Sequence, residues 1–238
     1  MRFPLSLRNV KDLLHERGHF GAASKALAPA LEPAKGLATV HWRAARSALA
    51  DQFVDRHGRG RQQRGDVGGR IGSAEVFAAA AGFGANGSQR AFHVYTVSKT
   101  REPIVSQGFI DVTPDYSIAD SPKPDIIVLP GGGTSSVISD PEWMAWVSAS
   151  AADADQVLTV CTGAFIAGKL GLLEGLDVTT WYAAVPSLTE QFPNARVIPG
   201  RRFIDNGKVI TTAGVSAGID GALHLVARTL GRYVADRT

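Results

Sequence analysis

Short apolar runs alternate with longer amphipathic segments from about residue 73 to the C-terminus. The apolar runs have the length and β-branched content of buried strands, and they lie at residues 91–98, 126–129, 157–160 and 201–214. The longer segments have helical periodicity or helix-starting residues, and they lie at residues 73–83, 140–154, 162–167 and 216–231. Strands that alternate with helices indicate an α/β protein whose mostly parallel sheet is covered on both faces.

Several residues mark where these elements begin or turn. Asp140-Pro141 is typical of a helix N-cap followed by the first helical position, and Ser73 is interpreted as a second N-cap. Asn206-Gly207 predicts the tight turn of a hairpin. Residues 177–188 are expected to supply a further strand.

The first 70 residues do not continue this alternation. Residues 55–72, "DRHGRGRQQRGDVGGRIG", are rich in Gly and Arg and show no periodicity, which is typical of a flexible linker. Residues 1–70 hold 13 Lys and Arg against 6 Asp and Glu, whereas residues 71–238 hold 12 against 16. We therefore expect residues 1–70 to be a poorly ordered basic extension and residues 71–238 to be the folded domain.

Composition restricts the class of protein. A hydrophobic fraction of 45% and a charged fraction of 20% are typical of a globular chain. No apolar stretch approaches the roughly 20 residues of a membrane helix, and the N-terminus does not resemble a signal peptide. One cysteine excludes an internal disulfide, so a cytoplasmic location is expected. Nucleic acid is not an expected partner, because no aromatic or helix-turn-helix pattern accompanies the basic extension.

The single cysteine lies between a predicted strand and a predicted helix. The run at residues 157–160 ends at Cys161, and Thr162 and Gly163 begin the helix. A nucleophile at such a junction projects from the carboxyl end of the sheet, where the helix N-terminus lowers the pKa of a thiol. Most lone cysteines are small buried hydrophobes, but this context favours a reactive Cys161 with the Thr162 N–H directed at an oxyanion.

A second loop, "LPGGG" at residues 129–133, also follows a predicted strand. Glycine lets main-chain N–H groups approach a ligand closely, so this loop is a candidate for a second oxyanion donor, although most glycine pairs are only turns. The loop lacks the spacing and lysine of a phosphate-binding loop and does not begin a dinucleotide fingerprint. No metal-ligand spacing is visible either, so neither a cofactor nor a metal is expected.

Four ordered segments together resemble the ThiJ/PfpI family: "DIIVLPGGG", "VCTGAFIAGKLGLLEG", "VTTWYAAVPSL" and "VITTAGVSAGIDGALHLV". The resemblance covers roughly residues 73–235 and extends to the isonitrile hydratase-like branch and to the similar sensing domains of AraC-type regulators. It implies a class I glutamine amidotransferase-like fold, which is a flavodoxin-like three-layer sandwich. It also implies a homodimer that binds a small molecule.

The resemblance assigns roles to particular residues. The family's nucleophile falls on Cys161, and the neighbour that isonitrile hydratases use with it falls on Thr162. The oxyanion-binding amides fall on Gly132 and Thr162, and Trp181 and Asp220 are further candidates for the ligand pocket. The implied reaction is a hydro-lyase reaction that adds water to an isonitrile to give an N-substituted formamide.

The chain departs from the family pattern around this site. Many members have a histidine after the paired threonines, where this chain has Trp181. The acidic residue that the family places ahead of "EVF" falls on Gly69, and Asp66 replaces it only if the loop rearranges. The family's apolar first strand has no counterpart in residues 57–68, so we expect that strand to be missing or altered.

The start of the chain suggests an origin for these departures, because "RFPLSLRNVKDLLHERG" resembles the N-terminal region of insertion-element transposases. Three hypotheses are open. The protein is an enzyme similar to isonitrile hydratase, or a non-enzymatic ligand-sensing domain similar to those of AraC-type regulators. The third is an inactive fusion of a transposase fragment with most of a ThiJ/PfpI domain.

Overall fold

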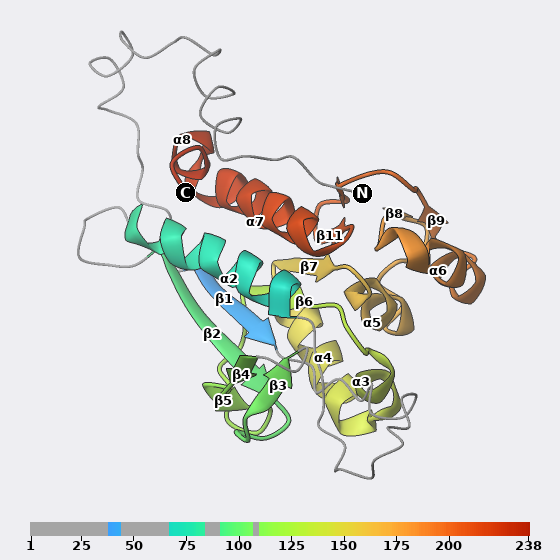
Figure 1. Ribbon diagram of the computed structural model, residues 1–238, viewed down its shortest axis with the longest axis horizontal. Coiled ribbons are helices and arrows are strands. Elements are labelled where there is room, and N and C mark those ends of the chain that lie inside the picture. The colour runs from blue at the N-terminus through green and yellow to red at the C-terminus, as the bar shows by residue number, and fades with distance from the viewer. Residues whose placement is uncertain (1–37, 44–66, 84–90, 107–109) are drawn as a thin grey trace, which may run out of the picture. The chain divides into compact units, whose positions relative to one another are not determined.

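A seven-stranded sheet forms the centre of the fold (Figure 1). The computed structural model describes residues 38–43, 67–83, 91–106 and 110–238. In spatial order the strands are β10 (Phe203–Asp205), β11 (Val209–Thr212), β7 (Gln156–Val160), β6 (Ile126–Leu129), β1 (Ala38–Arg43), β2 (Phe92–Ser98) and β5 (Tyr116–Ser117). All neighbouring strands are parallel except the edge strand β10, which is antiparallel to β11. The expected mostly parallel α/β sheet is therefore confirmed.

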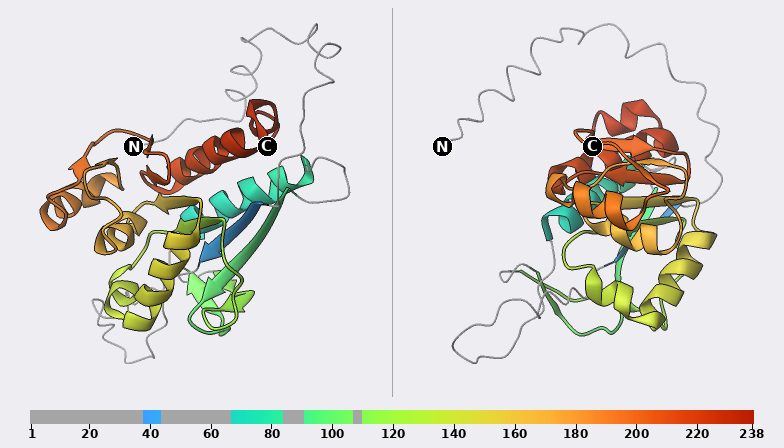
Figure 2. Two further views of the ribbon diagram at one scale, coloured as in Figure 1. Left: turned by 180° about the vertical axis from the view of Figure 1, so that it is seen from behind. Right: turned by 90° about the vertical axis from the view of Figure 1, so that its right-hand side faces the viewer.

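Helices cover both faces of this sheet, as the two views of Figure 2 show. On one face, α2 (Val67–Ala80) packs against α7 (Val215–Leu230). The other face carries α4 (Pro141–Asp153) and α5 (Gly163–Lys169). Successive side chains of a strand point to opposite faces, and accordingly Leu158 belongs to the α2–α7 core while Val157 belongs to the α4–α5 core. The expected three-layer sandwich is thus observed.

Smaller elements complete the described part of the chain. They are η1 (Ala81–Phe83), β3 (Ile104–Ser106), β4 (Ile110–Val112), α3 (Ser135–Ser139), β8 (Asp177–Val178), η2 (Tyr182–Ala184), α6 (Val185–Gln191), β9 (Arg196–Val197) and α8 (Arg232–Ala235). Strands β3 and β4 form an antiparallel pair, and β8 and β9 form a parallel pair. No helix among those described is both long and apolar enough to cross a membrane.

Two local predictions from the sequence are confirmed. The Asp140 side chain caps α4 by accepting hydrogen bonds from the N–H groups of Glu142 and Trp143, at 3.1 and 3.2 Å, and Pro141 is the first helical residue. Gly207 has a φ of 86° between β10 and β11, as the tight turn of the predicted hairpin requires. Both signals depend only on residues adjacent in sequence.

Of two other local predictions, one is wrong and the other holds only in part. Ser73 does not cap a helix, because α2 begins at Val67 and Ser73 lies inside it, fully buried. Its small side chain lets α2 and α7 approach closely, since a Cβ on Gly218 of α7 would lie 3.1 Å from Ser73 Oγ. Residues 177–188 supply only the two-residue strand β8, and η2 and α6 follow, with Pro186 in the first turn of α6.

The first strand of the sheet is present but comes from an unexpected part of the chain. Strand β1 lies between β2 and β6 and pairs in parallel with both, with Ala38 opposite Phe92 and Val40 opposite Ile126. The sequence assigns this segment to the basic extension, so two described elements, β1 and the start of α2, precede residue 71. The expectations for residues 1–37 and 44–66, including Asp66, fall outside the described residues.

A candidate active site at Cys161

Cys161 occupies a sharp turn between β7 and α5. Its φ is +58°, and no other non-glycine residue in the described ranges has a positive φ. This backbone conformation costs a non-glycine residue on the order of 1 kcal/mol or more and persists only where surrounding contacts fix it. Here the Cys161 N–H donates to the Ala213 carbonyl at 2.9 Å, and the Cys161 carbonyl accepts from Thr180 Oγ1 at 2.7 Å. The predicted sharp turn between strand and helix, which we call the elbow, is therefore present and is held from two sides.

Gly131, in the loop after β6, lies directly against the cysteine. A Cβ at this position would be 2.6 Å from Cys161 Cβ, 3.1 Å from Cys161 Sγ and 3.0 Å from the Thr162 nitrogen. Such distances leave no room for any side chain other than hydrogen. Because Gly131 has no side chain, the Cys161 thiol and the Thr162 nitrogen both border the space that a Cβ at this position would fill.

The Thr162 side chain contacts the next glycine of the same loop. Thr162 Oγ1 accepts a hydrogen bond from the Gly132 N–H at 2.9 Å and donates one to the Gly132 carbonyl at 2.9 Å. Gly132 has a φ of +105°, which strongly favours glycine. The Gly132 N–H, a candidate oxyanion donor on the sequence, is thus directed at the Thr162 hydroxyl in this structure.

Trp181 lies beside the elbow, where the sequence places it. The residue before it, Thr180, donates to the Cys161 carbonyl, and Trp181 Cδ1 is 3.4 Å from the position of a Cβ on Gly214. The indole is 40% exposed, and its ring contacts the 80% exposed ring of Tyr182 at a centroid distance of 5.3 Å. Gly214 is followed by Val215, the first residue of α7 and an exposed apolar side chain. The position after the paired threonines therefore carries a partly exposed indole and not a histidine.

Asp220 and Gly69 both lie within helices, whereas Trp181 lies beside the turn at Cys161. Asp220 lies on α7 and forms an ion pair with Arg202, whose Nε is 2.6 Å from the carboxylate. This contact directs the Asp220 side chain toward the segment that precedes edge strand β10. Gly69 is in the first turn of α2, so the family's acidic position is inside a helix and has no carboxylate.

Two residues of the elbow were missed on the sequence. Gly131 was not distinguished from its neighbours in the glycine run, although it is the one whose Cβ would collide with Cys161. In the sequence Thr180 marks only the position before Trp181, yet its buried hydroxyl donates a hydrogen bond to the Cys161 carbonyl. The paired threonines were a usable signal for Thr180, but nothing in a run of three glycines shows which one contacts the thiol.

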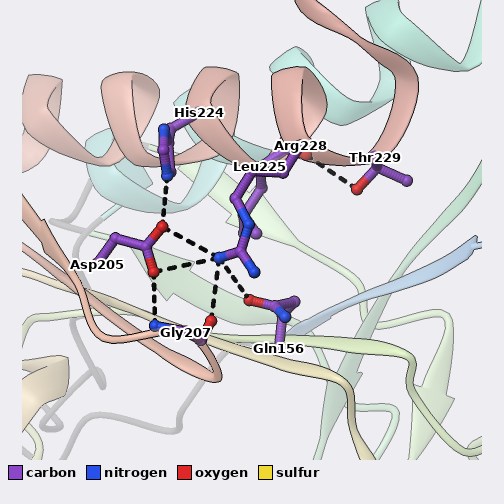
Figure 3. Close-up of polar contacts among 7 residues, drawn as sticks. All are labelled: Gln156, Asp205, Gly207, His224, Leu225, Arg228 and Thr229. Carbon is purple, nitrogen blue, oxygen red and sulfur yellow. Dashed lines mark hydrogen bonds and ion pairs between the residues drawn. The ribbon is translucent and has the colours of Figure 1, made fainter.

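A second polar cluster lies at the opposite end of the strands, around Asp205 (Figure 3). The carboxylate accepts from His224 Nε2 at 2.6 Å, from the Gly207 N–H at 2.7 Å and from Arg228 Nη1 at 3.1 Å. Arg228 also donates to the Gln156 side chain at 3.2 Å. The adjoining pocket of about 210 Å³ is lined by Asp125, Ile126, Asp155, Gln156, Leu225, Arg228 and Thr229. The cluster ties the β10–β11 hairpin to the second half of α7.

This cluster predicts a pH-dependent contribution to stability. Burial alone raises the pKa of Asp205, but the hydrogen bonds from His224 and Gly207 and the charge of Arg228 outweigh it and hold this pKa below its usual value. A lowered folded-state pKa stabilises the protein above the unfolded pKa of about 3.9, and this contribution is lost as the pH falls through the folded value. Asp205→Asn should therefore lower the free energy of unfolding by about 1–3 kcal/mol at pH 7, and by less near pH 3.

Urea denaturation of both proteins at the two pH values measures the difference. Asp153→Asn is the matched control, because Asp153 forms its ion pair with the highly exposed Lys123 on the surface. We expect that control to change stability far less at either pH. An Asp205→Asn effect of the same size at pH 7 and pH 3 would contradict the assignment of a lowered pKa.

The fold and the elbow define a class of protein: a parallel α/β sandwich with a cysteine at the carboxyl end of a central strand. The family that matches the sequence is the DJ-1/PfpI family, over residues 71–228, and the chain belongs to this family. This confirms the resemblance to ThiJ/PfpI proteins drawn from the sequence motifs. No group of three or more His, Cys, Asp or Glu residues within the described ranges is arranged to hold a metal ion.

Similar proteins include an enzyme and several transcriptional regulators. The chain is 33% identical to isonitrile hydratase of Pseudomonas putida over 140 aligned residues. The alignment covers 58% of this chain and 60% of that protein. It is 26% identical over 141 residues to the HTH-type transcriptional regulator GbdR of Pseudomonas aeruginosa, covering 59% of this chain and 38% of the regulator. The chain thus spans at most about three fifths of the length of these two relatives.

Solved structures show the same fold. A ThiJ/PfpI family protein from Pseudomonas syringae superposes with a TM-score of 0.70 at 22% identity, covering 94% of this chain and 81% of that one. DJ-1beta of Drosophila melanogaster superposes with a TM-score of 0.65 at 17% identity, covering 84% of this chain and 94% of that one. At these identities the likeness supports the fold and does not extend to activity.

Proposed function

We propose that the protein hydrates isonitriles to N-substituted formamides, with Cys161 as the nucleophile. The observation that carries this proposal is the position of Cys161, whose strained φ of +58° presents the thiol at the start of α5. The similarity to isonitrile hydratase supports the choice of reaction. We propose further that the functional unit is a cytoplasmic homodimer, in which residues 71–238 together with β1 form the family domain.

The reaction needs a nucleophile, an electrophilic carbon and one water. In the proposed path the Cys161 thiolate adds to the terminal isonitrile carbon, which takes up a proton to give a thioimidate, R–N=CH–S–Cys. Water then adds to that carbon and protonates the nitrogen to give R–NH–CH(OH)–S–Cys. The hydroxyl loses its proton as the C–S bond breaks, which releases R–NH–CHO and the thiolate and returns the proton taken up in the first step. The Thr162 N–H is the proposed donor to charge that develops at the reacting group.

The surroundings of Cys161 indicate which substrates fit and how fast they react. The exposed rings of Trp181 and Tyr182 favour an apolar R group. Gly69 and Trp181 stand where relatives have an acid and a histidine, and neither transfers protons. Proton transfer therefore passes through water and the thiol itself, so we expect turnover to be slow, because a positioned acid or base typically contributes about 10²–10⁴-fold.

A second function is favoured by one specific observation, the similarity to the regulator GbdR. In a ligand-sensing domain the site around Cys161 would bind a small molecule without converting it. The missing acid and histidine fit this alternative as well, because binding needs neither group.

The assay that separates the two functions uses purified full-length protein and cyclohexyl isocyanide. Formamide is measured by chromatography, and binding is measured by thermal shift. The enzyme proposal predicts formamide formation that falls at least about 100-fold in Cys161→Ser, since the replacement removes the nucleophile. It also predicts faster formation in Gly69→Asp.

The remaining outcomes are equally informative. Binding of small ligands without any formamide would support the sensing function and overturn the enzyme. Formamide formation at the same rate in Cys161→Ser would show that the reaction does not use this cysteine.

A further inference from the structure

The Thr162 hydroxyl makes two hydrogen bonds to one residue. It accepts from the Gly132 N–H and donates to the Gly132 carbonyl, each at 2.9 Å. The two residues belong to different elements, because Gly132 is in the loop after β6 and Thr162 immediately precedes α5. The contact therefore joins the glycine loop to the start of the helix that follows Cys161.

This contact uses the hydroxyl in a way that conflicts with a direct chemical role. A hydroxyl has a single proton, and here the Thr162 proton is donated to the Gly132 carbonyl. To protonate a substrate or orient a water through that proton, Thr162 would first have to release Gly132. The Gly132 N–H is likewise engaged by Thr162 and would become an oxyanion donor only after the same release.

We propose that the Thr162 side chain is a positioning residue, which holds the Gly131–Gly132 loop against Cys161, and that the Thr162 main-chain N–H is the group that faces the substrate. This inference rests on the proposed role of Cys161 as the nucleophile. The loop needs such support, because Gly131 lies so close to Cys161 that a Cβ on it would be 3.1 Å from Sγ. A small displacement of the loop therefore changes the space at the thiol.

The fixed conformation of Gly132 supports the same conclusion. Its φ of +105° is accessible almost only to glycine, and a glycine without a partner samples many other conformations. The two hydrogen bonds select one of these conformations. Removing the hydroxyl should therefore release the loop without removing any group that contacts the substrate.

Two substitutions at one position test the proposal. Thr162→Val keeps the shape of the side chain and removes the hydroxyl, whereas Thr162→Ser keeps the hydroxyl and removes a methyl group. Hydrogen exchange of the Gly132 amide, followed by NMR, reports the contact directly. Rates of Cys161 alkylation by iodoacetamide and by the larger N-ethylmaleimide report the space at the thiol, and neither reaction requires catalytic turnover.

We expect Gly132 amide exchange to become about tenfold faster in Thr162→Val, because a hydrogen bond that protects it is lost. We expect the ratio of the N-ethylmaleimide rate to the iodoacetamide rate to rise about tenfold as well, since the released loop opens the approach to Sγ. Thr162→Ser should keep both values within about twofold of the wild type. Rescue by the serine variant separates the hydroxyl from a general packing effect.

A different pattern would overturn the proposal. If Thr162→Val left amide exchange and both alkylation rates unchanged, the hydroxyl would not position the loop, and a loss of hydration in that variant would assign it a direct chemical role. Failure of the proposed function looks different: the wild type would make no formamide, while the exchange and alkylation measurements would still decide the role of Thr162.

Discussion

Cys161 should be alkylated by iodoacetamide with a pH midpoint below the free-thiol value of about 8.5. The physical reason is the turn at φ +58°, which places the thiol at the first N–H groups of α5, where the partial positive charge favours the thiolate. Burial acts in the opposite direction, because Cys161 is only 9% exposed. We expect the helix N-terminus to lower the thiol pKa by more than burial raises it, because the Thr162 nitrogen and the thiol both border the space next to Gly131.

Because the chain has a single cysteine, all alkylation can be assigned to Cys161. Cys161→Ser should abolish labelling, and the same wild-type chain unfolded in urea should titrate near the free-thiol value, which serves as the internal control. The shift should be smaller than in Cys–His pairs, where midpoints reach about 3–4, because Trp181 and Gly69 carry no charge. A folded-state midpoint at or above about 8.5 would refute the reactive elbow and the enzyme proposal with it.

The parts of the fold that could be predicted are those with local signals. The Asp140-Pro141 cap and the Asn206-Gly207 turn were readable because their hydrogen bonds join near neighbours in sequence. The strand and helix on either side of Cys161 were readable from one apolar run and the small residues after it. A sharp turn at Cys161 follows from these two elements, because the strand ends and the helix begins at this residue.

The first strand could not be predicted, because nothing local identifies it. Residues 38–43 are separated from α2 by residues 44–66, and their place in the sheet depends on pairing with Phe92 and Ile126, far along the chain. The family pattern places its first strand ahead of "EVF", where residues 57–68 have no apolar run. Parallel pairing carries no short turn that would mark its partners.

The details of the site depended on contacts between distant residues. The sequence showed three adjacent glycines and a threonine, but not that Gly131 touches the thiol while Gly132 binds the Thr162 hydroxyl. Asp220 is similar, because its ion pair with Arg202 joins the start of α7 to the segment before β10. Which of several equivalent residues makes a contact is decided by packing, and packing is not visible in a motif.

Gly163 is the position where a single methyl group should cost the most stability. It is the first residue of α5 and is buried, and a Cβ on it would overlap the Leu129 carbonyl oxygen and lie 2.8 Å from the Leu129 carbonyl carbon. The neighbours are main-chain atoms of β6, so no side-chain rotation relieves the overlap. Helix α5 would have to move away from the sheet.

We therefore expect Gly163→Ala to lower the free energy of unfolding by roughly 2 kcal/mol or more, which corresponds to a melting temperature about 4–8 °C lower for a chain of this size. Alanine has the better helix propensity by about 1 kcal/mol, so any net loss is a lower bound on the steric cost. The matched control is Gly82→Ala in η1, where a Cβ would meet nothing within 4 Å, and which should be neutral or slightly stabilising.

The same variant also tests the link between packing and chemistry. Moving α5 away from β6 separates the Thr162 hydroxyl from Gly132 and takes the helix N-terminus away from the thiol, so the alkylation midpoint of Cys161 should rise toward the free-thiol value of about 8.5. Calorimetry and the iodoacetamide pH profile on both glycine variants give the two readouts. If Gly163→Ala instead had the same melting temperature as Gly82→Ala and kept a low alkylation midpoint, that result would contradict the close approach of α5 to the end of β6. It would also contradict the loop contact that positions Gly131 at Cys161.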